Sequence, residues 1–209
     1  MKNNRTIFTG LTKESWDAGL RWVRFVKQEG VTISVVDMGL EFEQVSKLQE
    51  LSVVVLPNTK KTGVAQVDIF NSLVTQVQDG QFLFWDVEVQ TTDHMAMWGL
   101  LFSAPLLKNF NVHTLVFPLT AIDSRVRMAT SLENEVISKY NSVLFSGLMA
   151  GSLYDWKLFT GLYSTLVETA VVETMISARN LALNLFALYF PDRIDPKPVE
   201  YQISALQMP

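Results

Sequence analysis

The sequence predicts an α/β protein: a Rossmann-like α/β layer over residues 1–128, followed by a helical C-terminal part with one long helix. Short β-branched runs alternate with amphipathic stretches as far as about residue 128, which is typical of strands that alternate with helices. The last third is helical in pattern. Its stretch Leu162–Phe190 contains no Gly or Pro, and its only charged residues are Glu168, Glu173 and Arg179.

The elements of the first part follow from their boundaries. Thr12 is a suitable N-cap and Gly30 a suitable C-terminal glycine, so a helix is expected between them. Pro57 ends a β-branched run, and Gly80 ends an amphipathic helix. In chain order we expect a strand at residues 6–9, a helix at 12–29, a strand at 31–37, a helix at 40–50, a strand at 51–56, a helix at 64–78 and a strand at 81–90.

The second part contains one more stretch of sheet and then helices. The expected elements are a helix at residues 95–107, a strand at 113–119 that residues 122–128 could extend, a helix at 131–149, the long helix at 162–190 and a short strand at 201–206. Pro191, Pro196 and Pro198 end the long helix. We therefore expect an α/β domain over 1–128, a helical region over 129–190 and a Pro-rich tail over 191–209.

Composition excludes several classes of protein. A net charge of −4 with scattered Lys and Arg argues against nucleic-acid binding. The absence of Cys excludes disulfides, thiolate zinc sites and a cysteine nucleophile, and it fits a reducing compartment, so we expect an intracellular protein, peripheral to a membrane complex if it joins one. A membrane span at the long apolar stretch is not favoured, because Arg179, Asn180 and Asn184 lie within it.

No pattern of residues predicts a self-contained active site. The glycines never give a phosphate-binding loop, and the turn that begins at Asp37 after a strand is common in α/β proteins. Asp86 and Glu88 face the same side of one strand, where paired carboxylates could do acid–base work or bind a cation, but a solvated strand face is the simpler interpretation. His94 follows Asp93 without a metal-binding spacing. We therefore expect no cofactor, no metal and no catalysis by the isolated chain.

The start of the long helix resembles a known family. Leu162-Tyr163-Ser-Thr-Leu166-Val-Glu168, with Glu173 further on, is similar to the LYxxLxExxxxE pattern that opens the C-terminal helix of the gamma subunit of rotary ATP synthases. Upstream, the stretches at 79–82 and 115–119 resemble two further motifs of that family. The resemblance implies a central-stalk protein in which these five residues contact a ring of nucleotide-binding subunits that carry out the catalysis.

Three hypotheses follow for the function. The first is a non-catalytic stalk or coupling subunit whose partners are other protein subunits. The second is a self-assembling structural protein, such as a viral or phage shell component, which would use the apolar helix for contacts between copies. The third is a small α/β enzyme whose site is assembled from Asp37, Asp86, Glu88 and His94.

Overall fold

The computed structural model describes residues 5–27, 31–87, 110–115, 135, 138–139, 143–168 and 175–199. Its strands are β1 (Arg5–Leu11), β2 (Thr32–Asp37), β3 (Val54–Pro57), β4 (Gln81–Trp85), β5 (Phe110–Leu115), β6 (Val143–Ser152) and β7 (Ile194–Val199). Its helices are α1 (Trp16–Val26), α2 (Phe42–Glu50), α3 (Ala65–Gln76), α7 (Leu153–Glu168), α8 (Met175–Tyr189) and the short η1 (Pro191–Arg193). The predicted α/β class with a Rossmann-like layer is confirmed.

The strands form one mixed sheet in the order β3-β2-β1-β4-β6-β5-β7. The four strands β1 to β4 are parallel, so their carboxyl ends lie at one edge of the sheet. The chain runs outward from β1 to β3 and then returns to the other side of β1 to form β4. In open α/β sheets such a reversal of strand order leaves a crevice at the carboxyl ends of the strands, where ligands bind.

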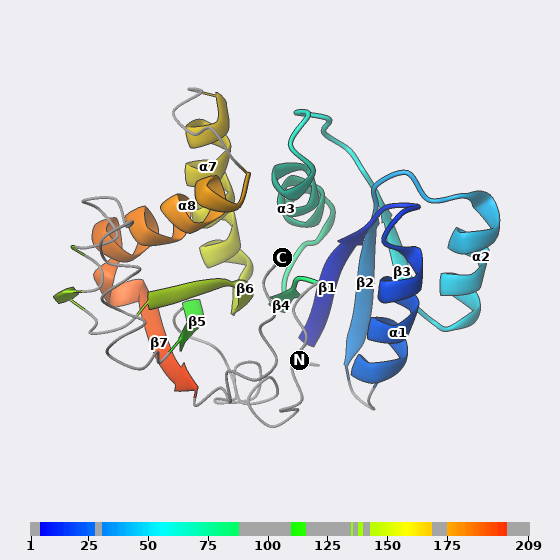
Figure 1. Cartoon of the computed structure of the whole chain (residues 1–209), viewed down its shortest axis with the longest axis horizontal. Helices are drawn as coiled ribbons and strands as arrows, with labels where there is room; N and C mark the ends of the chain where they lie inside the picture. Colours follow the sequence, from blue (N-terminus) through cyan, green and yellow to red (C-terminus); the bar gives the residue numbers. More distant parts are fainter. Residues whose placement is uncertain are drawn as a thin grey trace.

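The two faces of the sheet carry separate apolar cores, which alternating residues of the strands supply. Ile7 of β1 and Leu83 of β4 pack under α1 and α2. Phe8 and Phe84, one position further along the same strands, pack on the opposite face under α3, α7 and α8. This period of two is what a strand buried on both faces produces, and it gives the layers seen in Figure 1.

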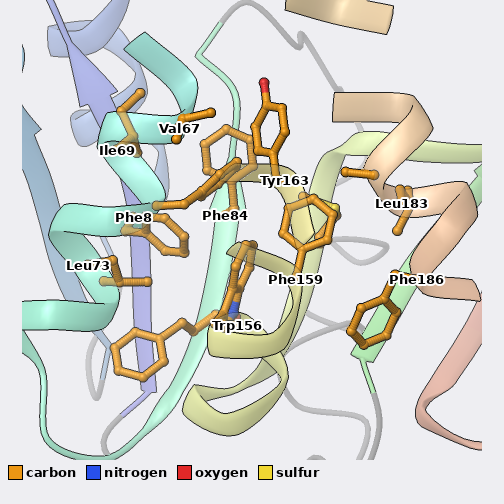
Figure 2. Packing of buried hydrophobic residues seen from close by; sticks show 14 of the residues in the cluster. Phe8, Val67, Ile69, Leu73, Phe84, Trp156, Phe159, Tyr163, Leu183 and Phe186 are labelled. Atoms are coloured by element: carbon orange, nitrogen blue, oxygen red, sulfur yellow. The ribbon is translucent and has the colours of Figure 1, made fainter. Parts of the chain in front are cut away.

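The second core is rich in aromatic rings. The rings of Phe8, Phe84, Trp156 and Phe159 converge between the sheet and the helices, as Figure 2 shows. Phe8 and Trp156 meet edge to face with ring centroids 5.1 Å apart. The indole N–H of Trp156 donates to the carbonyl of Phe82 at 3.0 Å, so the one polar atom of this ring is paired. The packing fixes α7 firmly against the sheet.

The expected single helix over Leu162–Phe190 is not observed. The described residues form two helices, α7 and α8, whose axes run in different directions (Figure 1). The rings of Phe159 and Phe186 have centroids 6.3 Å apart, whereas one straight helix would separate these residues by about 40 Å at 1.5 Å per residue. The apolar faces of the two helices therefore cover each other and the sheet.

The residues after 142 also contribute strands that the sequence did not predict. β6 lies where the end of a helix was expected, and it pairs with β4 and β5 in antiparallel fashion. β7 belongs to the Pro-rich stretch and pairs with β5 at the margin of the sheet, where Pro is tolerated because it needs no ladder donor. The expected domain boundary near residue 128 lies outside the described residues and stays a prediction. Within the described ranges, no helix has the length and apolarity needed to cross a membrane.

Candidate functional site

A pocket of about 520 Å³ opens at the carboxyl ends of β2 and β3. This is the edge of the sheet at which the strand order predicts a ligand site. Its lining comes from the turn after β2, the loop after β3 and the first turn of α3: Asp37, Met38, Gly39, Leu40, Pro57, Asn58, Lys61, Gly63, Ala65 and Asp68. The lining combines carboxylates, an amide and one ammonium group with apolar surface, which is the composition expected of a small-molecule site.

Asp37 shapes the rim of the pocket. Its Oδ1 accepts hydrogen bonds from the backbone N–H groups of Gly39 at 2.9 Å and of Leu40 at 2.7 Å. Gly39 has a φ of 110°, a conformation that residues with a Cβ rarely adopt. Both bonds use the same carboxylate oxygen. The other oxygen, Oδ2, has no partner within the described residues and can accept a hydrogen bond from a ligand.

The loop between β3 and α3 is held by its own side chains. Asp68, which is buried, accepts from the backbone N–H of Thr62 at 2.8 Å and from its hydroxyl at 2.7 Å. Ser72 accepts from the N–H of Thr59 at 3.1 Å. These bonds fix the loop and leave Lys61 exposed on the pocket lining. Lys61 is therefore a positioned cation at the rim, suited to attract an anionic ligand.

A second polar cluster lies at the end of β4. Arg179 of α8 donates from NH1 to Oδ2 of Asp86 at 2.9 Å, and the two side chains are 7% and 17% exposed. The Arg179 guanidinium also lies 5.6 Å from the centroid of the Phe84 ring. Tyr163 donates its hydroxyl hydrogen to Gln66 of α3 at 3.2 Å. Burial raises the pKa of Tyr163 to about 12, although the nearby charge of Arg179 acts in the opposite direction.

The pocket and the β4 cluster share the same edge of the sheet. Phe84 is in register with Phe8, and Leu11 is in register with Asp37. Asp86 therefore lies within about one residue of the level of Asp37 along the strands. The backbones of β2 and β4 are two strand spacings apart, about 10 Å.

Two of the four residues considered for an enzyme lie at the carboxyl edge of the sheet, in separate places. Asp37 lines the pocket, and Asp86 lies at the end of β4 in an ion pair, not on a solvated strand face. Glu88 and His94 lie outside the described residues. Sequence reasoning missed Lys61, Asn58 and Asp68, which follow β3 without any recognised motif. Arg179 carried a signal, because a lone charge in an apolar helix needs a partner.

The five residues expected to bind a partner protein mostly face the interior. Tyr163 is fully buried, and Leu162 and Leu166 pack against the aromatic core. Glu168 is exposed and lies 3.9 Å from Lys60, and Glu173 is outside the described residues. Contact between this stretch and a partner stays a prediction that the structure does not test.

Comparison with known proteins identifies the fold. Neither a protein-family model nor a curated protein matches the sequence. Glucosyl-3-phosphoglycerate synthase from Mycobacterium tuberculosis with UDP matches with a TM-score of 0.56 and 11% identity, over 94% of this chain and 70% of that one. A structure of the same enzyme with Mn²⁺, UDP and glucosyl-3-phosphoglycerate gives 0.57 and 10%, over the same shares.

Two further glycosyltransferases share the fold. The galactosyltransferase LgtC, with donor and acceptor sugar analogues, matches with a TM-score of 0.55 and 13% identity, over 92% of this chain and 72% of that one. The glycosyltransferase GlyE of Streptococcus pneumoniae TIGR4 gives 0.53 and 12%, over 93% and 45%. These likenesses establish the fold of this chain, which is the α/β fold of GT-A-type glycosyltransferases.

The resemblance to the gamma subunit of rotary ATP synthases is therefore wrong. The structures that this chain resembles are glycosyltransferases, and no family model supports a gamma subunit. The hypothesis of a non-catalytic stalk subunit is contradicted with it, as is the expectation that the chain is not an enzyme. The short motif that starts at Leu162 suggested a helix that contacts partner subunits. The apolar residues of α7 instead pack into this protein's own core.

Proposed function

We propose that the chain binds a nucleoside-diphosphate sugar at the carboxyl edge of its sheet and transfers the sugar to an acceptor hydroxyl. The observation that carries this proposal is the pocket at the ends of β2 and β3, with the oxygen Oδ2 of Asp37 and the ammonium group of Lys61 on its lining. The fold supports it, since UDP is named with the synthase from Mycobacterium tuberculosis and donor and acceptor sugar analogues with LgtC.

The pocket suits the nucleoside part of such a donor. A carboxylate oxygen accepts hydrogen bonds from a ribose hydroxyl or from a base N–H, and Asp37 presents one at the rim. Its other oxygen is used by the turn, so the side chain is already held in place before the ligand binds. A preorganised acceptor loses little side-chain freedom on binding.

Lys61 suits the charged part of the donor. A diphosphate is anionic, and an exposed ammonium group at the rim attracts it from solution. In the transfer itself, the acceptor oxygen bonds to the anomeric carbon of the sugar while the bond from that carbon to the diphosphate oxygen breaks. The diphosphate leaves with the electron pair, and the acceptor releases its hydroxyl proton. Positive charge near the diphosphate stabilises this leaving group.

Calorimetric titration of UDP, GDP and CDP against the purified chain tests the proposal. We expect at least one of them to bind, and Lys61→Ala to lower its affinity about tenfold, as loss of a hydrogen bond to a charged group does. Lys60→Ala is the matched control, because Lys60 is exposed beside Lys61 but does not line the pocket. Absence of binding for all three nucleotides would contradict the proposal.

A second pair of titrations assigns the two ends of the ligand. In Asp37→Asn, the side-chain oxygen Oδ1 can still accept the two hydrogen bonds of the turn. The second oxygen, an acceptor, is replaced by an NH₂ group, which is a donor. The substitution should weaken uridine and UDP alike if UDP is the nucleotide that binds. Lys61→Ala should weaken UDP and leave uridine unchanged. Release of UDP from UDP-glucose in the presence of sugar acceptors then measures the transfer reaction.

A further inference from the structure

The pocket at the ends of β2 and β3 holds a second carboxylate besides that of Asp37, and it is the more deeply buried of the two. Asp68, in the first turn of α3, is only 4% exposed and yet lines the pocket. Both hydrogen bonds that it accepts, from the backbone N–H and the hydroxyl of Thr62, end on Oδ1. Its Oδ2 has no partner among the described residues. Because an unpaired polar atom is costly at such a depth, Oδ2 is an acceptor for a donor group of the ligand.

An amide group lies about one helical turn from this carboxylate. The Oδ1 atom of Asn58 accepts from the N–H of Lys60 at 3.3 Å and from the hydroxyl of Ser72 at 3.4 Å. Ser72 stands four residues after Asp68, on the same face of α3. Because the amide oxygen is engaged, the NH₂ group of Asn58 keeps its donors for the pocket, which Asn58 also lines. The pocket therefore offers an acceptor and, beside it, a donor.

This pair of groups matches one kind of nucleobase edge. Uracil and guanine carry a ring N–H, which donates, next to a carbonyl oxygen, which accepts. Cytosine and adenine carry a ring nitrogen without hydrogen next to an amino group, so at the same two places an acceptor would meet an acceptor and a donor would meet a donor. A base of the second kind leaves Oδ2 of Asp68 unpaired, and buried polar groups left unpaired are what makes a site reject an analogue.

The burial of the two carboxylates assigns the parts of the nucleoside. In a nucleoside diphosphate, the ribose joins the base to the diphosphate. With the diphosphate attracted by the exposed Lys61, the ribose faces the half-buried Asp37 and the base lies further in, against the buried Asp68. Apolar residues of the lining supply contacts for the faces of a planar ring: Met38, Leu40, Pro57 and Ala65.

We infer that Asp68, with Asn58 beside it, selects the base of the bound nucleotide: the pocket admits uracil or guanine and rejects cytosine and adenine. This rests on the function proposed above, because it requires that a nucleotide fills this pocket. Asp37 is then the contact of the ribose, a part that all nucleotides share.

Titration of the unmodified chain with UDP and CDP gives the first test, because these nucleotides differ only at the edge in question. We expect UDP to bind about tenfold or more tightly than CDP. UDP methylated at N3 has lost the ring N–H and should bind as weakly as CDP. If only purine nucleotides bind, IDP and ADP are the corresponding pair, since their bases differ in the same two groups.

The outcomes separate the inference from the proposed function. Equal affinities within a pair, or a preference for CDP or ADP, would overturn the inference while the proposed function stands. If UDP, GDP, CDP, IDP and ADP all fail to bind, the proposed function fails and the inference with it.

Titration of Asp68→Asn with UDP and CDP gives the second test. The amide oxygen can still accept the bonds from Thr62, but an NH₂ group replaces the acceptor that faces the base. We expect the ratio of UDP to CDP affinity to fall about tenfold or more. If Asp68 only held the loop, both nucleotides would weaken equally and the ratio would not change, and this result would overturn the inference.

Asp37→Asn is the matched control, because it makes the same chemical change in the same pocket. It should weaken UDP and CDP equally and leave their ratio unchanged, since the two nucleotides share the ribose. An equal change of the ratio in both variants would overturn the assignment of the base to Asp68. Circular dichroism verifies the fold of each variant before titration. If Asp68→Asn does not fold, the titrations of the unmodified chain with UDP, CDP and N3-methylated UDP decide the question.

Discussion

Two arginine–aspartate pairs lie at opposite edges of the same sheet, and they differ in what surrounds them. At the carboxyl edge of β4, Arg179 meets Asp86, and both side chains retain some exposure. At the amino edge, Arg193 meets Asp155, whose side chain is fully buried. Ser152, the last residue of β6, lies opposite Gln81, the first residue of β4, and donates its hydroxyl to the second oxygen of Asp155 at 2.6 Å.

The two pairs differ in what lies beside them. Both oxygens of Asp155 accept hydrogen bonds within the protein, so that pair joins the start of α7 to η1. The Asp86 pair lies at the edge where the strand order reverses and a pocket opens. The same two residue types thus join two helical elements at one edge and join α8 to the end of β4 at the other.

The largest expected effect concerns the amino edge. Arg193→Met leaves the buried carboxylate of Asp155 without its cation, and we expect a loss of about 3–5 kcal/mol in the free energy of unfolding. Urea denaturation followed by circular dichroism measures it. A loss below about 1 kcal/mol, as for exposed ion pairs, would show that Asp155 is adequately held by Ser152 and that the two edges do not differ as described.

The second effect concerns the pH dependence near the carboxyl edge. The pKa of Tyr163 is raised to about 12 in the folded state from about 10 in the unfolded chain. Because the folded value is the higher one, this contribution is complete below pH 10 and is lost as pH rises through 12. We expect the loss to be about 2 kcal/mol. Unfolding at pH 9 and 11.5 measures it, and Tyr163→Phe should flatten the difference. An unchanged slope in the variant would refute the assignment.

A smaller effect concerns the turn that shapes the pocket. Gly39→Ala forces a Cβ into a backbone with φ of 110°, although nothing lies within 4 Å of the added atom. We expect a loss of about 1 kcal/mol or more from strain alone. Because the strain acts on the Asp37 turn, nucleotide affinity should fall as well. A variant with unchanged stability would mean that the turn relaxes without cost.

The smallest effect has the opposite sign and belongs to α7, which begins at the amino edge. Gly161→Ala meets nothing within 4 Å in the middle of this helix. We expect a gain of about 0.5–1 kcal/mol, because alanine loses less backbone freedom than glycine on forming a helix. Thermal unfolding of Gly161→Ala and Gly39→Ala, measured side by side, compares the two changes in stability. Destabilisation by Gly161→Ala would indicate an added contact that the described residues do not contain.

The sequence predicted the first part of the fold well, for a local reason. β1, β2 and β4 are β-branched or aromatic runs buried on both faces, and glycines mark the turns after β2 and before β4. These signals lie within a few residues of one another. β6 carries no such local signal, because its apolar residues suit a helix equally well and pairing with two distant strands decides its state.

The candidate site was only partly visible in the sequence. Asp37 and Asp86 follow strands, and their position was noted, but nothing local shows that two strands ending far apart in sequence share one edge. Lys61 lies at the pocket because hydrogen bonds between Thr62 and Asp68 hold its loop in place, and the sequence does not show these bonds. Arg179 reaches Asp86 only because α8 folds back against α7 and β6, which the prediction of one continuous helix excluded.

The sequence by itself determined the alternation of strands and helices and the apolar character of α7 and α8, because period and composition are local properties. Tertiary structure alone decided what covers those helices. Their apolar faces are buried against each other and against Phe8 and Phe84 of the sheet. It also decided which charges meet, since Asp86 and Arg179 become neighbours only when burial of the aromatic core brings α8 onto the sheet.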